Sequence, residues 1–137
     1  MSYQISNALE KFRDQNFSGA LKELENILKS DPENVTAILT KARCQLALQH
    51  TDAAHSSYQA LIKYPKIGDA AKAEANLYLG NFTQAVSIYK NILQQNAGDD
   101  ETLFLASVAY YKLGQIQASV NHLEKAVESG FEWEDDT

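Results

Sequence analysis

Turn-forming residues recur along this 137-residue chain at intervals close to 34 residues. Pro32 and Pro65 lie 33 residues apart, and Gly80 and Gly114 lie 34 residues apart, each glycine between two stretches of helical periodicity. A fixed period in this range is typical of folds that stack one supersecondary unit several times. Aligning the chain with itself gives four repeats, followed by an acidic tail at 134–137; the repeats span residues 1–34, 35–65, 66–99 and 100–133.

Within each repeat, small and large side chains return at the same places. Small residues stand eight and twenty positions into each repeat, where they let two helix axes approach closely; they are Ala8, Ala42, Ala73 and Ser107, then Ala20, Ala54, Ala85 and Ser119. Large side chains follow four positions later and fill the space beside them; they are Leu24, Tyr58, Tyr89 and Leu123. The pattern predicts that every repeat is a helical hairpin.

The 3.6-residue periodicity and the stop signals predict an all-α fold without strands. Asp31 is expected to cap the third helix and Pro32 to occupy its first turn, where proline is favoured. Asp99, Asp100 and Glu101 open a later helix, where capping explains the acids. The predicted helices span residues 3–15, 17–30, 33–48, 51–64, 69–79, 82–96, 100–113 and 116–129.

A 34-residue helix-turn-helix period, with these small residues and a proline near position 32, resembles the tetratricopeptide repeat. The resemblance covers residues 1 to about 133 and implies a right-handed superhelical solenoid of about eight antiparallel helices in four hairpins. The chain departs from the usual pattern at three places. The large residue at position 4 is replaced by Gln4 and Asp69, the glycine at position 15 is replaced by Gln15 and Gln49, and the third repeat lacks about three residues around 66–68.

Charge and composition exclude several classes of partner. The net charge is −6, and no run of Lys and Arg offers the basic face that a nucleic acid needs. No stretch approaches the roughly 20 apolar residues of a membrane span, and the start of the chain lacks a secretion signal. With a single cysteine, Cys44, an intramolecular disulfide cannot form. We therefore expect a cytoplasmic protein that neither binds nucleic acid nor inserts into membranes.

The residues that could support chemistry do not form a recognisable site. His50 falls in a turn and His122 is expected to face water; no pair of histidines has zinc-ligand spacing, and neither phosphate-binding glycine motif occurs. Cys44 lies among small apolar residues, which favours a buried, inert thiol over a nucleophile. We predict no catalytic, cofactor-binding or metal-binding residues, and hence no enzyme activity in this chain.

The resemblance implies a binding surface. In tetratricopeptide proteins the first helix of each repeat lines a concave groove through its positions 2, 5, 9 and 13. The residues carried over to this chain are Ile5, Leu9, Arg13, Leu39, Arg43, Glu74, Tyr78, Phe104, Val108 and Lys112. An apolar floor with basic residues around it suits a peptide that carries apolar anchors and a carboxylate. The alternative is that the apolar residues pack between helices and the cations are solvated.

The sequence leaves the last helix without a following helix to cover it. Three arrangements are open: Phe131 and Trp133 fold back over it, two copies pair through it, or the chain is part of a longer protein. The acidic segment 132–136 could also dock in the groove of another copy, although a solvated tail is the simpler interpretation.

The function that we predict is a non-catalytic protein-interaction module or scaffold that binds a peptide or partner helix in its groove. Two alternatives follow from the same sequence. The chain could be the regulatory or substrate-recruiting N-terminal region of a larger enzyme, or a structural protein that forms homo-oligomers through its C-terminal helix.

Overall fold

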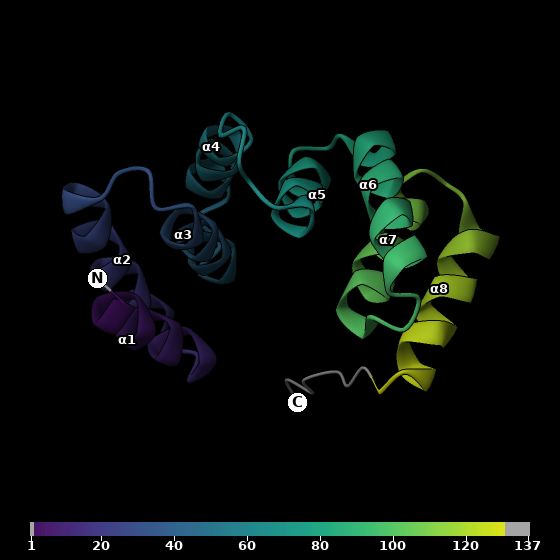
Figure 1. The fold of residues 1–137 in the computed structure, drawn as a ribbon, viewed down its shortest axis with the longest axis horizontal. Coiled ribbons are helices and arrows are strands. Elements are labelled where there is room, and N and C mark those ends of the chain that lie inside the picture. Colours follow the sequence, from purple (N-terminus) through teal and green to yellow (C-terminus); the bar gives the residue numbers. More distant parts are fainter. Residues whose placement is uncertain (1, 131–137) are drawn as a thin grey trace. The chain divides into compact units, whose positions relative to one another are not determined.

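A computed structural model describes residues 2–130, with the side chains of residues 4–130 (Figure 1). Over this range the chain is helical, with no strand. It divides into two compact units, Met1–Ile67 and Gly68–Thr137, each built from two consecutive helical hairpins. The boundary between the units therefore falls within residues 66–68, where the repeat pattern is shortened.

The helices follow the predicted order. Unit 1 contains α1 (Ser2–Arg13), α2 (Phe17–Ser30), α3 (Val35–Ala47) and α4 (Thr51–Leu61). Unit 2 contains α5 (Asp69–Tyr78), α6 (Phe82–Gln95), α7 (Asp100–Lys112) and α8 (Ile116–Glu128). The bounds predicted for α2 are confirmed, and α4 ends three residues earlier than predicted. Among the described residues, no helix has the length and apolar character needed to cross a membrane.

One turn geometry joins the two helices of every hairpin. The residue before the N-cap of the second helix has a positive φ in each turn: Gln15 and Gln49 at 63°, Gly80 at 86° and Gly114 at 76°. The N-cap residue itself donates its backbone N–H to the carbonyl five positions earlier in the chain, at 2.8–2.9 Å. This is the bonding pattern of a Schellman motif, which satisfies carbonyls left free at the helix end. The glutamines that replace glycine thus keep the left-handed backbone of glycine.

The start of α3 differs from the prediction. Asp31 and Pro32 do not begin this helix: the backbone N–H of Asp31 donates to the Ile27 carbonyl at 2.8 Å and so ends α2. Asn34 is the N-cap instead, and its Oδ1 accepts the N–H of Ala37 at 3.0 Å. The prediction for the acidic cluster at 99–101 is confirmed, because Asp99 caps α7 through Oδ1 and the N–H of Thr102.

Each unit has its own apolar core around the repeated small residues. In unit 1 the core is formed by Ala8, Ala20, Leu24, Ile27, Ala37 and Cys44. In unit 2 it is formed by Ala73, Leu77, Ala85, Val86, Tyr89, Ala106, Ala109 and Tyr110. Full burial of Ala8, Ala42 and Ala73 confirms the close helix approach that their repetition predicts.

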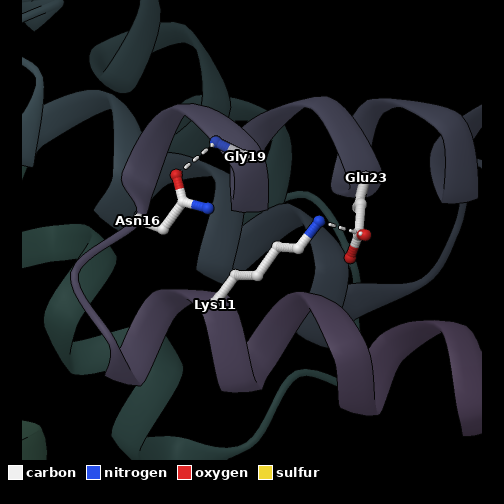
Figure 2. Close-up of polar contacts among 4 residues, drawn as sticks. All are labelled: Lys11, Asn16, Gly19 and Glu23. Atoms are coloured by element: carbon white, nitrogen blue, oxygen red, sulfur yellow. Dashed lines mark hydrogen bonds and ion pairs between the residues drawn. The ribbon is translucent and has the colours of Figure 1, made fainter.

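Polar side chains add contacts across the hairpins. In the first hairpin, Lys11 Nζ of α1 lies 2.6 Å from Glu23 Oε1 of α2, and Asn16 caps α2 by accepting the N–H of Gly19 at 3.1 Å (Figure 2). In the second hairpin, the buried Ser57 hydroxyl donates to Gln45 Oε1 at 2.7 Å. Such bonds orient the two helices of a hairpin, because a buried polar atom without its partner is costly.

Candidate interaction surface

The predicted groove residues of unit 1 lie on α1 and α3, two first helices that contact each other. We call this set the unit 1 strip; its members are Ile5, Leu9, Arg13, Leu39 and Arg43. The three aliphatic side chains are half-buried, Arg43 is half-buried and Arg13 is exposed. Spacings of four residues along each helix place them on one face. The strip therefore combines partly accessible apolar area with guanidinium groups.

The predicted groove residues of unit 2 lie on α5 and α7, which also contact each other. We call this set the unit 2 strip; its members are Glu74, Tyr78, Phe104, Val108 and Lys112. Tyr78 is 45% exposed and Lys112 is exposed, whereas Phe104 and Val108 are half-buried. Glu74 is only 5% exposed, so its carboxylate offers little surface to a partner.

A polar cavity in unit 1 was missed by sequence reasoning. It has a volume of about 240 Å³ between α1 and α2 and is lined by Gln4, Asn7, Glu23, Asn26, Ile27 and Ser30. Glu23 Oε1 is bound to Lys11, whereas its Oε2 is buried without a hydrogen-bond donor among the described residues. The sequence signal for this cavity was Gln4, which stands where the family pattern has a large residue. We call this surface the α1–α2 end face.

A second cavity, of about 300 Å³, lies in unit 2 where α6, α7 and α8 meet. Its lining combines Lys90, Lys125 and His122 with the apolar side chains of Leu93 and Leu103. The expectation that His122 faces water is wrong, because its ring lies 4.8 Å from the ring of Tyr110 on α7. Its Nδ1 is also 2.7 Å from the Ala118 carbonyl. Helical period alone could not reveal that α7 covers this side of α8.

The structure also locates the residues considered for chemistry. Cys44 is fully buried in the unit 1 core, and burial raises the pKa of its thiol to about 11. The burial that was predicted for this thiol is confirmed, and the raised pKa favours the thiol over the thiolate, which is the reactive form. Within residues 2–130, no group of three or more His, Cys, Asp and Glu side chains is arranged to hold a metal ion.

Two comparisons relate the chain to known sequences. The family model described as tetratricopeptide repeat matches residues 11–64 and 76–134. The TPR repeat-containing protein MJ1428 of Methanocaldococcus jannaschii is 25% identical over 140 residues, which cover 96% of this chain. The chain spans about a quarter, 24%, of the length of that relative.

Comparison with solved structures supports the fold. TTC0263, a thermophilic TPR protein of Thermus thermophilus, superposes with a TM-score of 0.71 at 21% identity, covering 94% of this chain and 74% of that one. A MamA structure from Desulfovibrio magneticus RS-1, residues 41 to the end, gives a TM-score of 0.65 at 14% identity, with 94% and 75% covered. At these identities the likeness concerns the fold, which is an all-α helical solenoid.

Proposed function

Because the chain belongs to the tetratricopeptide repeat family, we propose that it is a non-catalytic scaffold whose first-helix strips bind a peptide or a helix of a partner protein. Solenoids of this family offer extended surfaces for protein partners. The observation that carries the proposal is the composition of the strips. In each unit, half-buried apolar side chains share a first-helix face with exposed cations, Arg13 in unit 1 and Lys112 in unit 2.

This composition defines the chemistry of the partner. Half-buried residues such as Leu9 and Val108 leave apolar area that an anchoring side chain can cover, which is where binding energy concentrates. The neighbouring cations favour a ligand that carries carboxylates, with a gain that falls as salt screens the charges. A partner segment with spaced apolar anchors and acidic residues meets both requirements.

The test compares strip variants with matched variants elsewhere. We expect Arg13→Ala and Val108→Ala to reduce the amount of each specific partner recovered in quantitative affinity capture by about threefold to tenfold. Lys22→Ala on α2 and Ile62→Ala at the C-terminal end of α4 remove exposed side chains of the same kinds outside the strips. Recovery of the same partners in equal amounts by all four variants would show that the strips are not the binding surface.

The alternative role as a recruiting region of a larger enzyme uses the same strips and makes a different prediction. In that case the captured proteins would be substrates of a catalytic domain joined to this module, and their turnover would fall with Arg13→Ala while the activity on a small model substrate stayed unchanged. A cytoplasmic location stays a prediction.

A further inference from the structure

An apolar stripe on α8 is exposed in unit 2. Ile116, Val120 and Val127 are 53%, 42% and 51% exposed, and Leu123 between them is half-buried. Their spacings of four, three and four residues align them along one side of the helix, as in a helix-pairing seam. A cavity of about 420 Å³ lies at the end of this stripe, lined by Leu123, Val127 and two acids, Glu124 and Glu128.

The equivalent side chains of the earlier second helices pack against apolar cores. In α6, the corresponding residues are Phe82, Val86 and Leu93, which pack in the core of unit 2, and α6 contacts α7. In α2, Phe17, Leu21 and Leu28 pack against the core of unit 1, and α2 contacts α3. The α8 stripe is thus the same helix-packing surface, and no helix covers it within residues 2–130.

We propose that this stripe binds the α8 stripe of a second copy of the chain, with the two helices antiparallel. The inference does not depend on the first-helix strips. A head-to-tail contact would instead place the stripe on the α1–α2 end face of another copy. That face carries Gln4, Asn7 and Glu23, with one carboxylate oxygen already lacking a donor. Burying these groups under valine and isoleucine would remove their water without replacing its hydrogen bonds.

The spacing of the stripe sets the register. An antiparallel pair centred between residues 121 and 122 places Ile116 opposite Val127 of the second copy, and Val120 opposite Leu123. All four apolar residues of each helix then meet an apolar residue of the other. A shift of one helical turn would leave a stripe residue of each copy in water.

The acids on α8 favour the antiparallel direction. In this register the end of α8 that carries Glu124 and Glu128 lies beside the first turn of α8 in the second copy, and Glu124 lies opposite Gln117 of that turn. Gln115 is the N-cap of α8 but makes no side-chain cap bond, and the first turn of the helix contains no acid. Carboxylates are stabilised at such a helix N-terminus by its free N–H groups and dipole. A parallel pair would instead place Glu124 and Glu128 beside the C-terminal end of the second α8, where the helix dipole disfavours negative charge.

The C-terminal end of the chain itself is another candidate to cover the α8 stripe. Residues 131–137 include Glu132, Glu134, Asp135 and Asp136. These acids would approach Glu124 and Glu128, which flank the stripe, and like charges repel. Charge therefore disfavours the chain's own tail as the cover and favours the second copy.

The experiment measures mass against concentration by sedimentation equilibrium. One 13-residue helix per copy makes a contact below the standard interface size, so we expect a dimer with a dissociation constant on the order of micromolar. The double variant Val120→Glu/Val127→Glu should weaken the dimer at least about 30-fold. Asn121→Glu adds a charge to the same helix outside the stripe and should leave the dimer intact. These sites are exposed, and unchanged helical circular dichroism confirms that each variant folds.

Cysteine cross-linking tests the direction. Residues 116 and 127 are separated by 11 residues, or about 16 Å along the helix, whereas a disulfide needs Cα atoms about 4.4–6.8 Å apart. In an antiparallel dimer the I116C/V127C variant cross-links and the I116C variant does not. Cys44 is fully buried and does not compete.

Four results would overturn the proposal. They are a monomeric mass up to millimolar concentration, a dimer unaffected by Val120→Glu/Val127→Glu, cross-linking of the I116C variant alone, and loss of the dimer in the variant Phe131→Ser/Trp133→Ser. An equal or tighter dimer in that last variant supports pairing through α8 rather than through the tail.

Discussion

The left-handed residue in each hairpin turn allows a reciprocal mutational test. Gln49 in unit 1 and Gly114 in unit 2 occupy the same position of the same turn, with φ of 63° and 76°. A Cβ built on Gly114 would meet no other heavy atom within 4 Å. Gly114→Ala therefore changes only the backbone preference and the freedom of the unfolded chain, and no packing.

The magnitude follows from these two effects. An L residue in the left-handed region costs roughly 1–2 kcal/mol, and replacing glycine recovers about 0.4–1 kcal/mol by restricting the unfolded chain. Gly114→Ala should therefore lower the free energy of unfolding by about 1 kcal/mol, and Gln49→Gly should raise it by a similar or smaller amount. The control is Gly98→Ala, because Gly98 also has open space around it and no positive φ.

The assay is urea unfolding followed by helical circular dichroism, with all three variants and the parent chain measured together. We expect the midpoint to fall for Gly114→Ala, to rise for Gln49→Gly, and to stay equal or rise slightly for Gly98→Ala. If Gly114→Ala were no more costly than Gly98→Ala, or if Gln49→Gly destabilised the protein, backbone conformation would not be the reason for glycine in these turns.

Two further predictions concern buried polar atoms in unit 1. Burial raises the pKa of the Cys44 thiol to about 11, so the folded state keeps a proton that the unfolded chain loses near pH 9. The raised pKa contributes on the order of 3 kcal/mol to the free energy of unfolding. This contribution is complete below pH 9 and is lost as the pH rises towards 11. Between pH 8 and pH 10.5, the free energy of unfolding in urea should decline less for Cys44→Ala than for the parent chain. Equal declines would contradict the raised pKa of Cys44. Ser57→Ala removes the donor to Gln45 Oε1 and should cost about 1–3 kcal/mol in the same assay; the second change Gln45→Leu should recover part of that loss, and no recovery would argue against an unpaired Gln45 oxygen as its cause.

The helical hairpins were predictable because their determinants recur in the sequence. Alanine at positions 8 and 20 of the first three repeats is buried, and so are Leu24, Tyr58 and Tyr89 at position 24. A repeated pattern reports tertiary packing as well as helical period, because one hairpin packs on the next in the same way. The fold class, the helix order and the burial of Cys44 could therefore be predicted.

Residues whose environment depends on a neighbouring element were harder to predict. Leu123 occupies the same position as Leu24 but is only half-buried, since no helix follows α8 in the described part of the chain. Asp31 and Asn34 are both good capping residues, and the choice between them depended on the bond from the Asp31 N–H to Ile27. Local preference ranks such alternatives but does not decide between them.

The groove residues could be assigned to helices but not to a formed site. The residues of each strip lie on contacting first helices, yet Glu74 is buried although the same family position holds the half-buried Leu9, Arg43 and Val108 in the other repeats. Exposure at these positions depends on how each first helix is rotated against its neighbours. That rotation is set by side chains of the next repeat, which a single family position does not encode.

The polar residues that replace large ones at position 4 show why a departure from a family pattern needs its surroundings. Asp69 lies in the first turn of α5, where the free N–H groups and the helix dipole favour an acid. Gln4 instead lines the polar cavity of the α1–α2 end face, together with Asn7 and Glu23. The same substitution thus stabilises a helix start in one repeat and removes an apolar contact surface in the other.

This difference gives the two outer helix faces opposite chemistry. The α1–α2 end face is polar, whereas the α8 stripe exposes isoleucine and valine. A head-to-tail contact between copies repeats without closing, whereas a symmetric pair closes after two copies. Because the polar side chains of the α1–α2 end face cannot replace an apolar partner for the α8 stripe, the self-association that we propose is a closed pair, which does not use the first-helix strips.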